Sequence, residues 1–242
     1  MARHILQTTD STNAHGLRLA PTLSGPAWFL GLEQSAGRGR RARAWASPRG
    51  NFHATLVMRP TEPASVVALR SFAAALALRD ALVALTDLGA ALTLKWPNDV
   101  LLNGGKVAGI LLESASSGAG VAHLAIGIGV NLIAAPDPGL LEPGALPAVT
   151  VLEESGHRVT PEAFLDLLAP AYARWERTFV AEGFAPLRQE WLAHAARLGQ
   201  QIRARTGTTS REGRFETVDA TGALILQMAA GPVAISAAEV FF

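Results

Sequence analysis

Short apolar runs alternate with polar, glycine-rich segments in the first half of the chain. Ala27–Leu32 and Phe52–Arg59 are two such runs, and their pattern predicts buried strands. Between them lies Gly37–Trp45, here named the arginine segment, which carries Arg38, Arg40, Arg41 and Arg43. We therefore expect these arginines on a loop that connects two strands.

Three stretches have the pattern of helices. Alanine and leucine dominate Ala64–Leu85, which predicts one long and mostly buried helix in the core. Thr160 and Pro161 are start signals for a second helix that runs toward Thr178, and a third is expected near Pro186–Leu198.

The strands cluster in the middle of the chain. Residues 92–114 hold two apolar β-type runs split by Asn103, Gly104 and Gly105, which tolerate the positive φ of hairpin turns. His123–Ile133 is expected to form a further strand, and the prolines and glycines of Ala134–Pro147 predict a loop.

The texture changes after Leu198. Short β-type runs are then separated by glycine-containing turns, which is typical of a small antiparallel barrel or sandwich. We place the boundary near Gly199, so that residues 1–198 and 199–242 form two domains.

Composition narrows the class of protein. The 242 residues are 49% hydrophobic, with no apolar run of membrane-spanning length and no secretory signal at the start, so we expect a globular cytoplasmic protein that contacts no membrane. The absence of cysteine excludes disulfides, thiolate zinc sites and thiol nucleophiles. The histidines have no metal-ligand spacing, so no metal site is expected from side chains.

The positive charge of the arginine segment is local. The formal net charge is +1 and the sequence pI is 8.4, below the value above about 9 that marks many nucleic-acid-binding domains. A local cationic cluster suits a compact anion better than a long phosphate backbone, although a solvated loop is the alternative.

The hairpin carries three ionisable groups, Lys95, Asp99 and Lys106. If the turn is Asn103-Gly104, Lys106 lies opposite Leu101 and about 7–8 Å from Asp99 on the same face, within reach of a lysine side chain. A turn one residue later would move Lys106 one step away. A carboxylate so placed would fix a lysine for neutralising an anion, and the alternative is a surface ion pair worth under about 1 kcal/mol.

Three further features have two interpretations each. Lys95 is either a functional cation of the hairpin or an exposed lysine at a strand end, and we adopt the second interpretation. The cluster Ser11, Thr12 and Asn13 fits a helix N-cap first and a ring of ligand contacts second. Trp45 either anchors the end of the arginine segment or lies on the ring of a ligand.

Four motifs, taken in order, resemble those of the biotin–protein ligase family. They are DSTN, GLEQSAGRGRRARAW, KWPNDVLLNGGKVAGILLE and GIGVNL, which together span Asp10 to Leu132. In the tail, GALIL is similar to the C-terminal barrel of that family.

The resemblance implies an α+β fold, with a mixed central sheet flanked by helices, like class II synthetases, and a small C-terminal SH3-like barrel. It also implies a two-step reaction. Biotin and MgATP give biotinyl-5′-adenylate and pyrophosphate, and a lysine of a biotin carboxyl carrier protein then takes the biotinyl group. Because ten residues precede Ser11, we expect no helix-turn-helix domain, no DNA partner and a ligase only.

The resemblance assigns roles to particular residues. The catalytic residues would be Lys106, Arg40 and Asp99. Biotin would be bound by Ser11, Thr12, Asn13, Gln34, Arg38, Gly39, Arg40, Lys106, Gly127 and Gly129. ATP would be bound by Arg38, Arg43, Trp45, Asn98, Lys106 and Asn131, with Mg²⁺ arriving on the ATP.

Further points qualify the predicted function. Ala42 stands where the family's loop usually has a third glycine, which would restrict the loop if that residue needs positive φ. A lipoate–protein ligase, with the same chemistry on a different acid, is the nearest alternative, and a nucleic-acid-binding module is a more distant one. The sequence leaves open whether the chain is a monomer or a homodimer.

Overall fold

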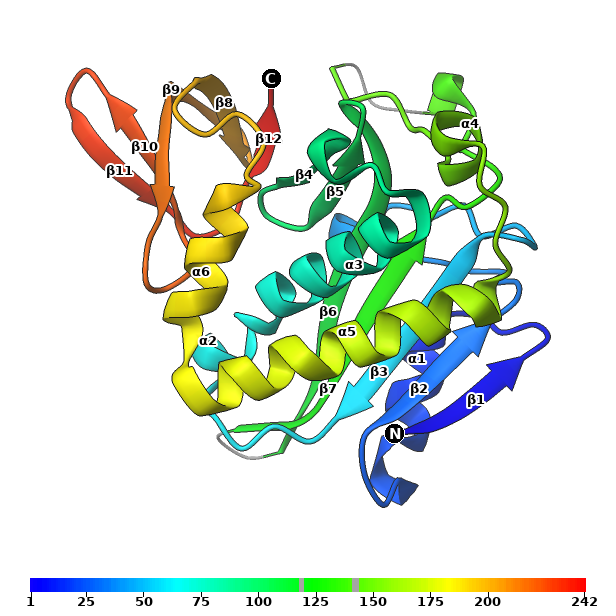
Figure 1. The fold of residues 1–242 in the computed structure, drawn as a ribbon. Helices are drawn as coiled ribbons and strands as arrows, with labels where there is room; N and C mark the ends of the chain where they lie inside the picture. Colours follow the sequence, from blue (N-terminus) through cyan, green and yellow to red (C-terminus); the bar gives the residue numbers. More distant parts are fainter. Residues whose placement is uncertain (118–119, 141–143) are drawn as a thin grey trace.

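A seven-stranded sheet forms the centre of the molecule and a five-stranded sheet forms its C-terminal end (Figure 1). The computed structural model describes residues 1–117, 120–140 and 144–242. The large sheet has the order β1-β2-β3-β7-β6-β5-β4, with β1 and β2 parallel and the other neighbours antiparallel. The prediction of a mixed sheet with flanking helices and a separate β unit is therefore confirmed.

The strands of the large sheet are β1 (Ala2–Leu6), β2 (Ala27–Gly31), β3 (Phe52–Met58), β4 (Leu92–Lys95), β5 (Asp99–Leu102), β6 (Gly105–Ser117) and β7 (Gly120–Val130). The helices are α1 (Thr12–Leu19), α2 (Ala64–Val67), α3 (Arg70–Thr86), α4 (Val151–Ser155), α5 (Pro161–Glu182) and α6 (Phe184–Ala193), with short 3₁₀ turns at Ala20–Thr22, Arg40–Ala42, Gly89–Ala91 and Pro138–Leu140. The small sheet contains β8 (Gln201–Thr206), β9 (Thr209–Val218), β10 (Leu224–Met228), β11 (Gly231–Ile235) and β12 (Glu239–Phe241).

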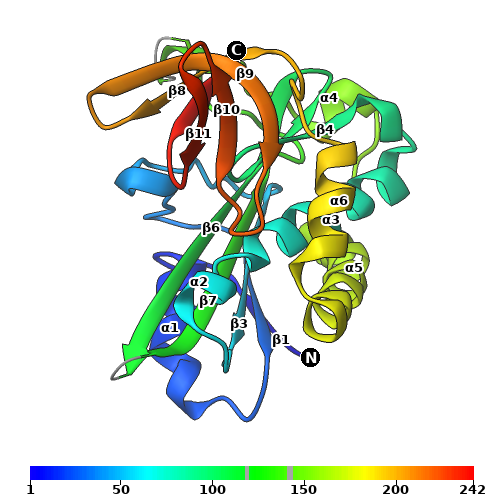
Figure 2. The same cartoon turned by 90° about the vertical axis from the view of Figure 1, so that its left-hand side faces the viewer.

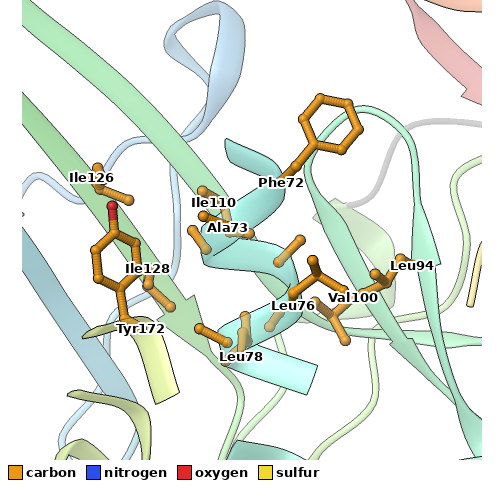
Figure 3. Close-up of a cluster of buried hydrophobic side chains, with 14 of the residues drawn as sticks. Phe72, Ala73, Leu76, Leu78, Leu94, Val100, Ile110, Ile126, Ile128 and Tyr172 are labelled. Atoms are coloured by element: carbon orange, nitrogen blue, oxygen red, sulfur yellow. The ribbon is translucent and has the colours of Figure 1, made fainter. Parts of the chain in front are cut away.

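The two faces of the large sheet have different tasks. Helices α3 and α5 cover one face, and α1 packs on the other (Figure 2). Figure 3 shows Ile126 and Ile128 of β7 in the core with α3 and Tyr172. Because side chains alternate along a strand, Gly127 and Gly129 belong to the opposite face, the one that α1 approaches. The apolar face thus stabilises the sheet, and the glycines leave room for other side chains on the opposite face.

The predicted long helix Ala64–Leu85 is divided in two. Between α2 and α3 the backbone bonds change from the α-helical i→i−4 pattern to i→i−3, with the amides of Leu69 and Ser71 donating to Val66 and Ala68. The chain therefore tightens for one turn without leaving the helical region.

The run 92–102 is also two strands rather than one. Pro97 has no amide proton to donate to a ladder, and Trp96, Pro97 and Asn98 turn the chain between β4 and β5. The next turn is the first of the two geometries considered above, because Leu101 pairs with Lys106 and Leu102 with Gly105.

Two elements carried no prediction. Strand β1 lies at the sheet edge and is mostly exposed, so its sequence lacks the apolar alternation that marks a strand. Helix α4 does have a sequence signal: the Thr150 hydroxyl accepts from the Glu153 amide at 3.0 Å and contacts the Glu153 carboxylate at 2.9 Å, a threonine-to-glutamate cap. The third predicted helix begins earlier and ends earlier than expected, at Phe184 and Ala193.

The small sheet is joined to the rest of the chain by specific contacts. Trp96 Nε1 donates to the Gly222 carbonyl at 3.1 Å, and Arg188 of α6 donates to the Val218 carbonyl. Gly199, with φ 78°, lies in the connection between α6 and β8, where the domain boundary was predicted. Within the described ranges, no helix is long and apolar enough to cross a membrane.

His53 gives the sheet a pH dependence. Its side chain on β3 is 1% exposed, and burial lowers its pKa from 6.5 to about 4. Between these two values the unfolded chain binds a proton that the folded chain does not, so the free energy of unfolding decreases as pH falls from about 6.5 to about 4.

We expect this contribution to be about 3 kcal/mol. Urea unfolding at pH 7 and pH 4 should show that the wild type loses about 3 kcal/mol more than His53→Gln, whose side chain does not titrate. Equal losses in the two proteins would contradict a neutral buried His53.

Candidate active site

Glycines on β7 let other side chains lie directly on the sheet. A Cβ on Gly127 would lie 2.9 Å from Asn13 Cγ, and a Cβ on Gly129 would lie 2.5 Å from Trp45 Cε2. Trp45 also covers Gly109 of β6, where a Cβ would lie 3.2 Å from the indole. The backbone of β6 and β7 is therefore the floor of the site, with Asn13 and Trp45 of this chain resting on it.

A hydrogen-bond network holds the predicted cluster of Thr12, Asn13 and Gln34 in place. Gln34 Oε1 accepts from the amide of Thr12 at 2.8 Å and from its hydroxyl at 3.1 Å. Asn13 Nδ2 donates to Glu113 Oε2 at 2.8 Å, and its Oδ1 accepts from the Thr55 hydroxyl at 2.6 Å. These side chains, with Ser11 as the N-cap of α1, form one polar group whose members are buried or half-buried.

The ion pair predicted in the hairpin is present, and it includes a second lysine. Asp99 Oδ1 lies 2.7 Å from Lys106 Nζ, and Asp99 Oδ2 lies 3.8 Å from Lys95 Nζ. Burial works to raise the pKa of Asp99, but the two ammonium groups outweigh burial and hold this pKa below its ordinary value. Asp99 is therefore a fixed carboxylate that orients Lys106.

The interpretation of Lys95 as an exposed lysine is wrong. Its side chain is 11% exposed, and burial lowers its pKa. Lys95 lies opposite Asp99 across the tight turn between β4 and β5, so the pairing follows from that turn. The sequence holds two lysines, Lys95 and Lys106, and both contact the same carboxylate.

The arginine segment lies between β2 and β3, as predicted, and reaches over this group. Arg38 Nη2 lies 3.4 Å from Glu113 Oε1, which connects the segment to β6. Arg40 is half-buried; burial lowers its pKa, and the carboxylate of Asp99 acts in the opposite direction. Its Nη1 donates to the Ala238 carbonyl at 3.3 Å.

The rest of the arginine segment contacts the C-terminal sheet. Arg41 Nη1 lies 3.1 Å from Glu239 Oε2, and Arg43 forms an ion pair with the same carboxylate. Arg205 of β8 contacts Glu239 Oε2 at 2.6 Å. Glu239 carried no sequence signal, because it comes close to the arginine segment only after the C-terminal sheet has formed.

Trp45 lies between the predicted groups. The indole ring is 5.4 Å from Lys106 Nζ, which places the ammonium over the ring face. Its Nε1 is buried and has no hydrogen-bond partner among the described residues. The indole therefore anchors the end of the segment against the floor, and its own donor is left unsatisfied.

Two residues predicted to reach a nucleotide have their amide donors engaged with the backbone. Asn98 Nδ2 donates to the Ile110 carbonyl at 2.6 Å, and Asn131 Nδ2 donates to the Val149 carbonyl at 3.2 Å. Gly39 donates its amide to the Arg43 carbonyl at 2.8 Å, closing the segment on itself. The ligand contacts assigned to these three residues stay predictions.

The left-handed residue of the arginine segment is Arg41, with φ 56°, one position before Ala42. A glycine in place of Ala42 would be needed only if the residue at that position had a positive φ. Arg41 takes that conformation in this chain, while the side chain of Ala42 lies outside the described residues.

Taken together, six cationic side chains surround two carboxylates, Asp99 and Glu239. They are Lys95, Lys106, Arg40, Arg41, Arg43 and Arg205. This surplus of fixed positive charge suits a site that brings anions together. A cavity of about 410 Å³ near Pro26, Met58 and His123 lies at the opposite ends of β2 and β3, away from this cluster.

Comparison with known proteins assigns the chain to a family. A family model described as the biotin/lipoate A/B protein ligase family matches residues 5–131, and a model of the biotin protein ligase C terminal domain matches residues 198–242. The chain belongs to the biotin/lipoate A/B protein ligase family.

Two individual relatives are similar to most of this chain. The chain is 61% identical over 238 residues to the biotin–[acetyl-CoA-carboxylase] ligase of Paracoccus denitrificans, covering 98% of this chain and 99% of that protein. It is 30% identical to the bifunctional ligase/repressor BirA of Bacillus spizizenii, covering 86% of this chain and 63% of that protein.

Solved structures share the fold. The biotin protein ligase of Aquifex aeolicus in complex with biotin and ATP superposes with a TM-score of 0.83 at 24% identity, covering 99% of this chain and 97% of that one. The Leishmania major enzyme with biotinyl-5-AMP gives a TM-score of 0.68 at 24% identity, covering 98% and 99%.

The glycine floor generates a stability prediction. In Gly127→Ala the new methyl group would displace Asn13, whose amide cannot move without breaking its bonds to Glu113 and Thr55. We expect a loss of about 1–3 kcal/mol in the free energy of unfolding, measured in urea. Gly120→Ala on the same strand is the matched control, because a Cβ there meets nothing within 4 Å. Equal stability of the two variants would contradict the close contact.

Proposed function

We propose that this chain is an ATP-dependent ligase that activates biotin as biotinyl-5′-AMP and transfers the biotinyl group to a lysine of a biotin carboxyl carrier protein. The observation that carries the proposal is the Asp99–Lys106 pair beside the arginine segment, in a chain 61% identical to a biotin–[acetyl-CoA-carboxylase] ligase. The Paracoccus denitrificans relative is a biotin–[acetyl-CoA-carboxylase] ligase and the Aquifex aeolicus structure contains biotin, which favours this acid over lipoate.

The first step joins two anions. A biotin carboxylate oxygen attacks the α-phosphorus of ATP, the bond to the bridging oxygen breaks, and pyrophosphate leaves. Charge accumulates on the phosphate oxygens in this step, so a fixed cation stabilises the transition state more than the separate reactants. Lys106 would supply that cation, and its contact with Asp99 at 2.7 Å would direct it.

The arginine segment would protect the product. Arg38 and Arg40 would neutralise the biotin carboxylate during approach, and the closed segment would keep water from the mixed anhydride. Arg43 would act on the phosphates and Trp45 would border the adenine.

The polar group on α1 would hold the acid in position. Thr12, Asn13 and Gln34 are buried or half-buried and already fixed by hydrogen bonds, so they would present their polar atoms at low entropic cost. Ser11 would join them from the cap of the same helix. Gly127 and Gly129 would let a bicyclic ring approach the sheet as closely as Asn13 and Trp45 do.

In the second step the amine of the carrier lysine attacks the acyl carbon and AMP leaves. The nucleophile belongs to the partner, so the site needs to hold the adenylate without reacting with it. We expect Mg²⁺ to accompany the phosphates of ATP, and the described ranges contain no group of three or more His, Asp or Glu side chains that could hold a metal. The cytoplasmic location and the choice between monomer and homodimer stay predictions.

Pyrophosphate exchange into ATP tests the substrate. We expect exchange with biotin, none without an acid and far less with lipoate. Lys106→Ala should reduce the biotin-dependent rate at least about 100-fold, because a fixed cation at the reacting phosphate is lost. The exposed Arg177→Ala is the control and should leave the rate unchanged. Equal exchange with lipoate would overturn the choice of acid, and a normal rate in Lys106→Ala would overturn the role of Lys106.

Arg40→Gly should separate formation of the adenylate from its retention. We expect adenylate formation to persist while the adenylate escapes and labels lysines of a bystander protein, because the segment no longer closes over it. Avidin blotting of added serum albumin would measure the escape, with the exposed Arg158→Gly as control. Retention as tight as in the wild type would contradict the role of the arginine segment.

A further inference from the structure

The arginine segment is fastened to the C-terminal sheet at one side chain. Glu239, the first residue of β12, contacts Arg41 at 3.1 Å and also pairs with Arg43. Beside it, the Ala238 carbonyl accepts from Arg40 Nη1 at 3.3 Å. Figure 2 shows the short helical turn at residues 40–42 facing the small sheet.

The carboxylate is itself held firmly. The side chain of Glu239 is 14% exposed, and Arg205, opposite it on β8, contacts Oε2 at 2.6 Å. Burial works to raise the pKa of Glu239, but Arg205 and Arg43 outweigh burial and hold this pKa below its ordinary value. A single exposed ion pair contributes little, whereas one poorly exposed carboxylate shared by three guanidinium groups forms a network.

The ion pairs of Glu239 hold the arginine segment at a residue whose backbone conformation is unfavourable. Arg41 has φ 56°, a conformation that L-residues other than glycine rarely adopt. Its side chain reaches Glu239 from this conformation, and Arg40, the neighbouring residue, then points toward Ala238 and the field of Asp99. The position of Arg40 near the cation cluster thus depends on the C-terminal sheet.

We propose that Glu239 is a positioning residue for the ligase reaction, through which the C-terminal domain holds the arginine segment in its closed place over the adenylation site. Glu239 acts through Arg41 and Arg43 and touches no reactant. The consequence for catalysis rests on the proposed function, whereas the positioning of the segment is independent of it.

Limited trypsin cleavage tests the positioning without any substrate. Trypsin cuts after arginine, and the side chains of Arg41 and Arg43 are 39% and 45% exposed, so the order of the segment limits cleavage there. Glu239→Gln keeps the size of the side chain and removes its charge. We expect cleavage after Arg41 and Arg43 to be about five-fold faster than in the wild type at low salt, as read by mass spectrometry of the fragments. Adding salt to the wild type should move its rate toward that of the variant.

Three variants separate positioning from general loosening of the C-terminal sheet. Glu216→Gln removes an exposed carboxylate that pairs with Arg214 at 2.5 Å on β9 of the same sheet, and should leave cleavage unchanged. Arg205→Gln removes the contact of Glu239 within the small sheet, together with the guanidinium that lies 4.9 Å from the centroid of the Phe241 ring, and should accelerate cleavage less than Glu239→Gln does. Glu239→Asp, which restores the charge, should recover part of the protection.

Catalytic assays on the same proteins give the second readout. In Glu239→Gln we expect release of adenylate without carrier to rise several-fold above wild type, because the arginine segment is no longer held over the site. Unchanged cleavage and unchanged release in Glu239→Gln would overturn the proposal, as would equal acceleration in Glu216→Gln. If the wild type shows no biotin-dependent exchange, the proposed function fails, and the cleavage result still decides whether Glu239 positions the segment.

Discussion

The carboxylate of Asp99 is buried among β4, β5 and β6, and the ammonium groups of Lys95 and Lys106 contact it from two strands. An unpaired carboxylate in this place would cost several kcal/mol, so its pairing with the two lysines stabilises the fold. Their pairing sets the register of both hairpins, because a shift by one residue would turn a charge to the apolar face. The two lysines at this end of the sheet are therefore arranged around one carboxylate, that of Asp99.

The alternation of side chains along β7 explains how the same strand serves the core and the site. Isoleucines face α3 and α5, and glycines face α1 and the arginine segment. The missing side chains make room for Asn13 and Trp45, which come from two other parts of the chain. If β7 carried apolar side chains on both faces, it could also form a strand, but Asn13 and Trp45 could not lie on its backbone.

The sequence predicts those parts of the site that are formed by residues close together in the chain. The turn residues Asn103 and Gly104 placed Lys106 within reach of Asp99, and Ser11 was recognised as a helix cap. The arginine segment was placed between two strands because apolar runs flank it. The division of 92–102 into two strands was not predicted, because both halves are apolar and only the proline separates them. The burial of Lys95 depends on that division and was therefore not predicted either. Glu239 lies nearly two hundred residues from Arg41 and Arg43 of the arginine segment, a separation that no sequence pattern bridges.

The contact of both lysines with Asp99 has a chemical consequence beyond charge balance. Every other fixed cation among the side chains of this protein is an arginine, which stays protonated and is a poor nucleophile toward an activated acyl group. The two primary amines of its side chains both contact the carboxylate of Asp99. A ligase of the proposed kind would thus offer its own reactive intermediate almost no side-chain acceptor, and the protein surface would be inert toward self-labelling while the lysine of a docked partner is free to react.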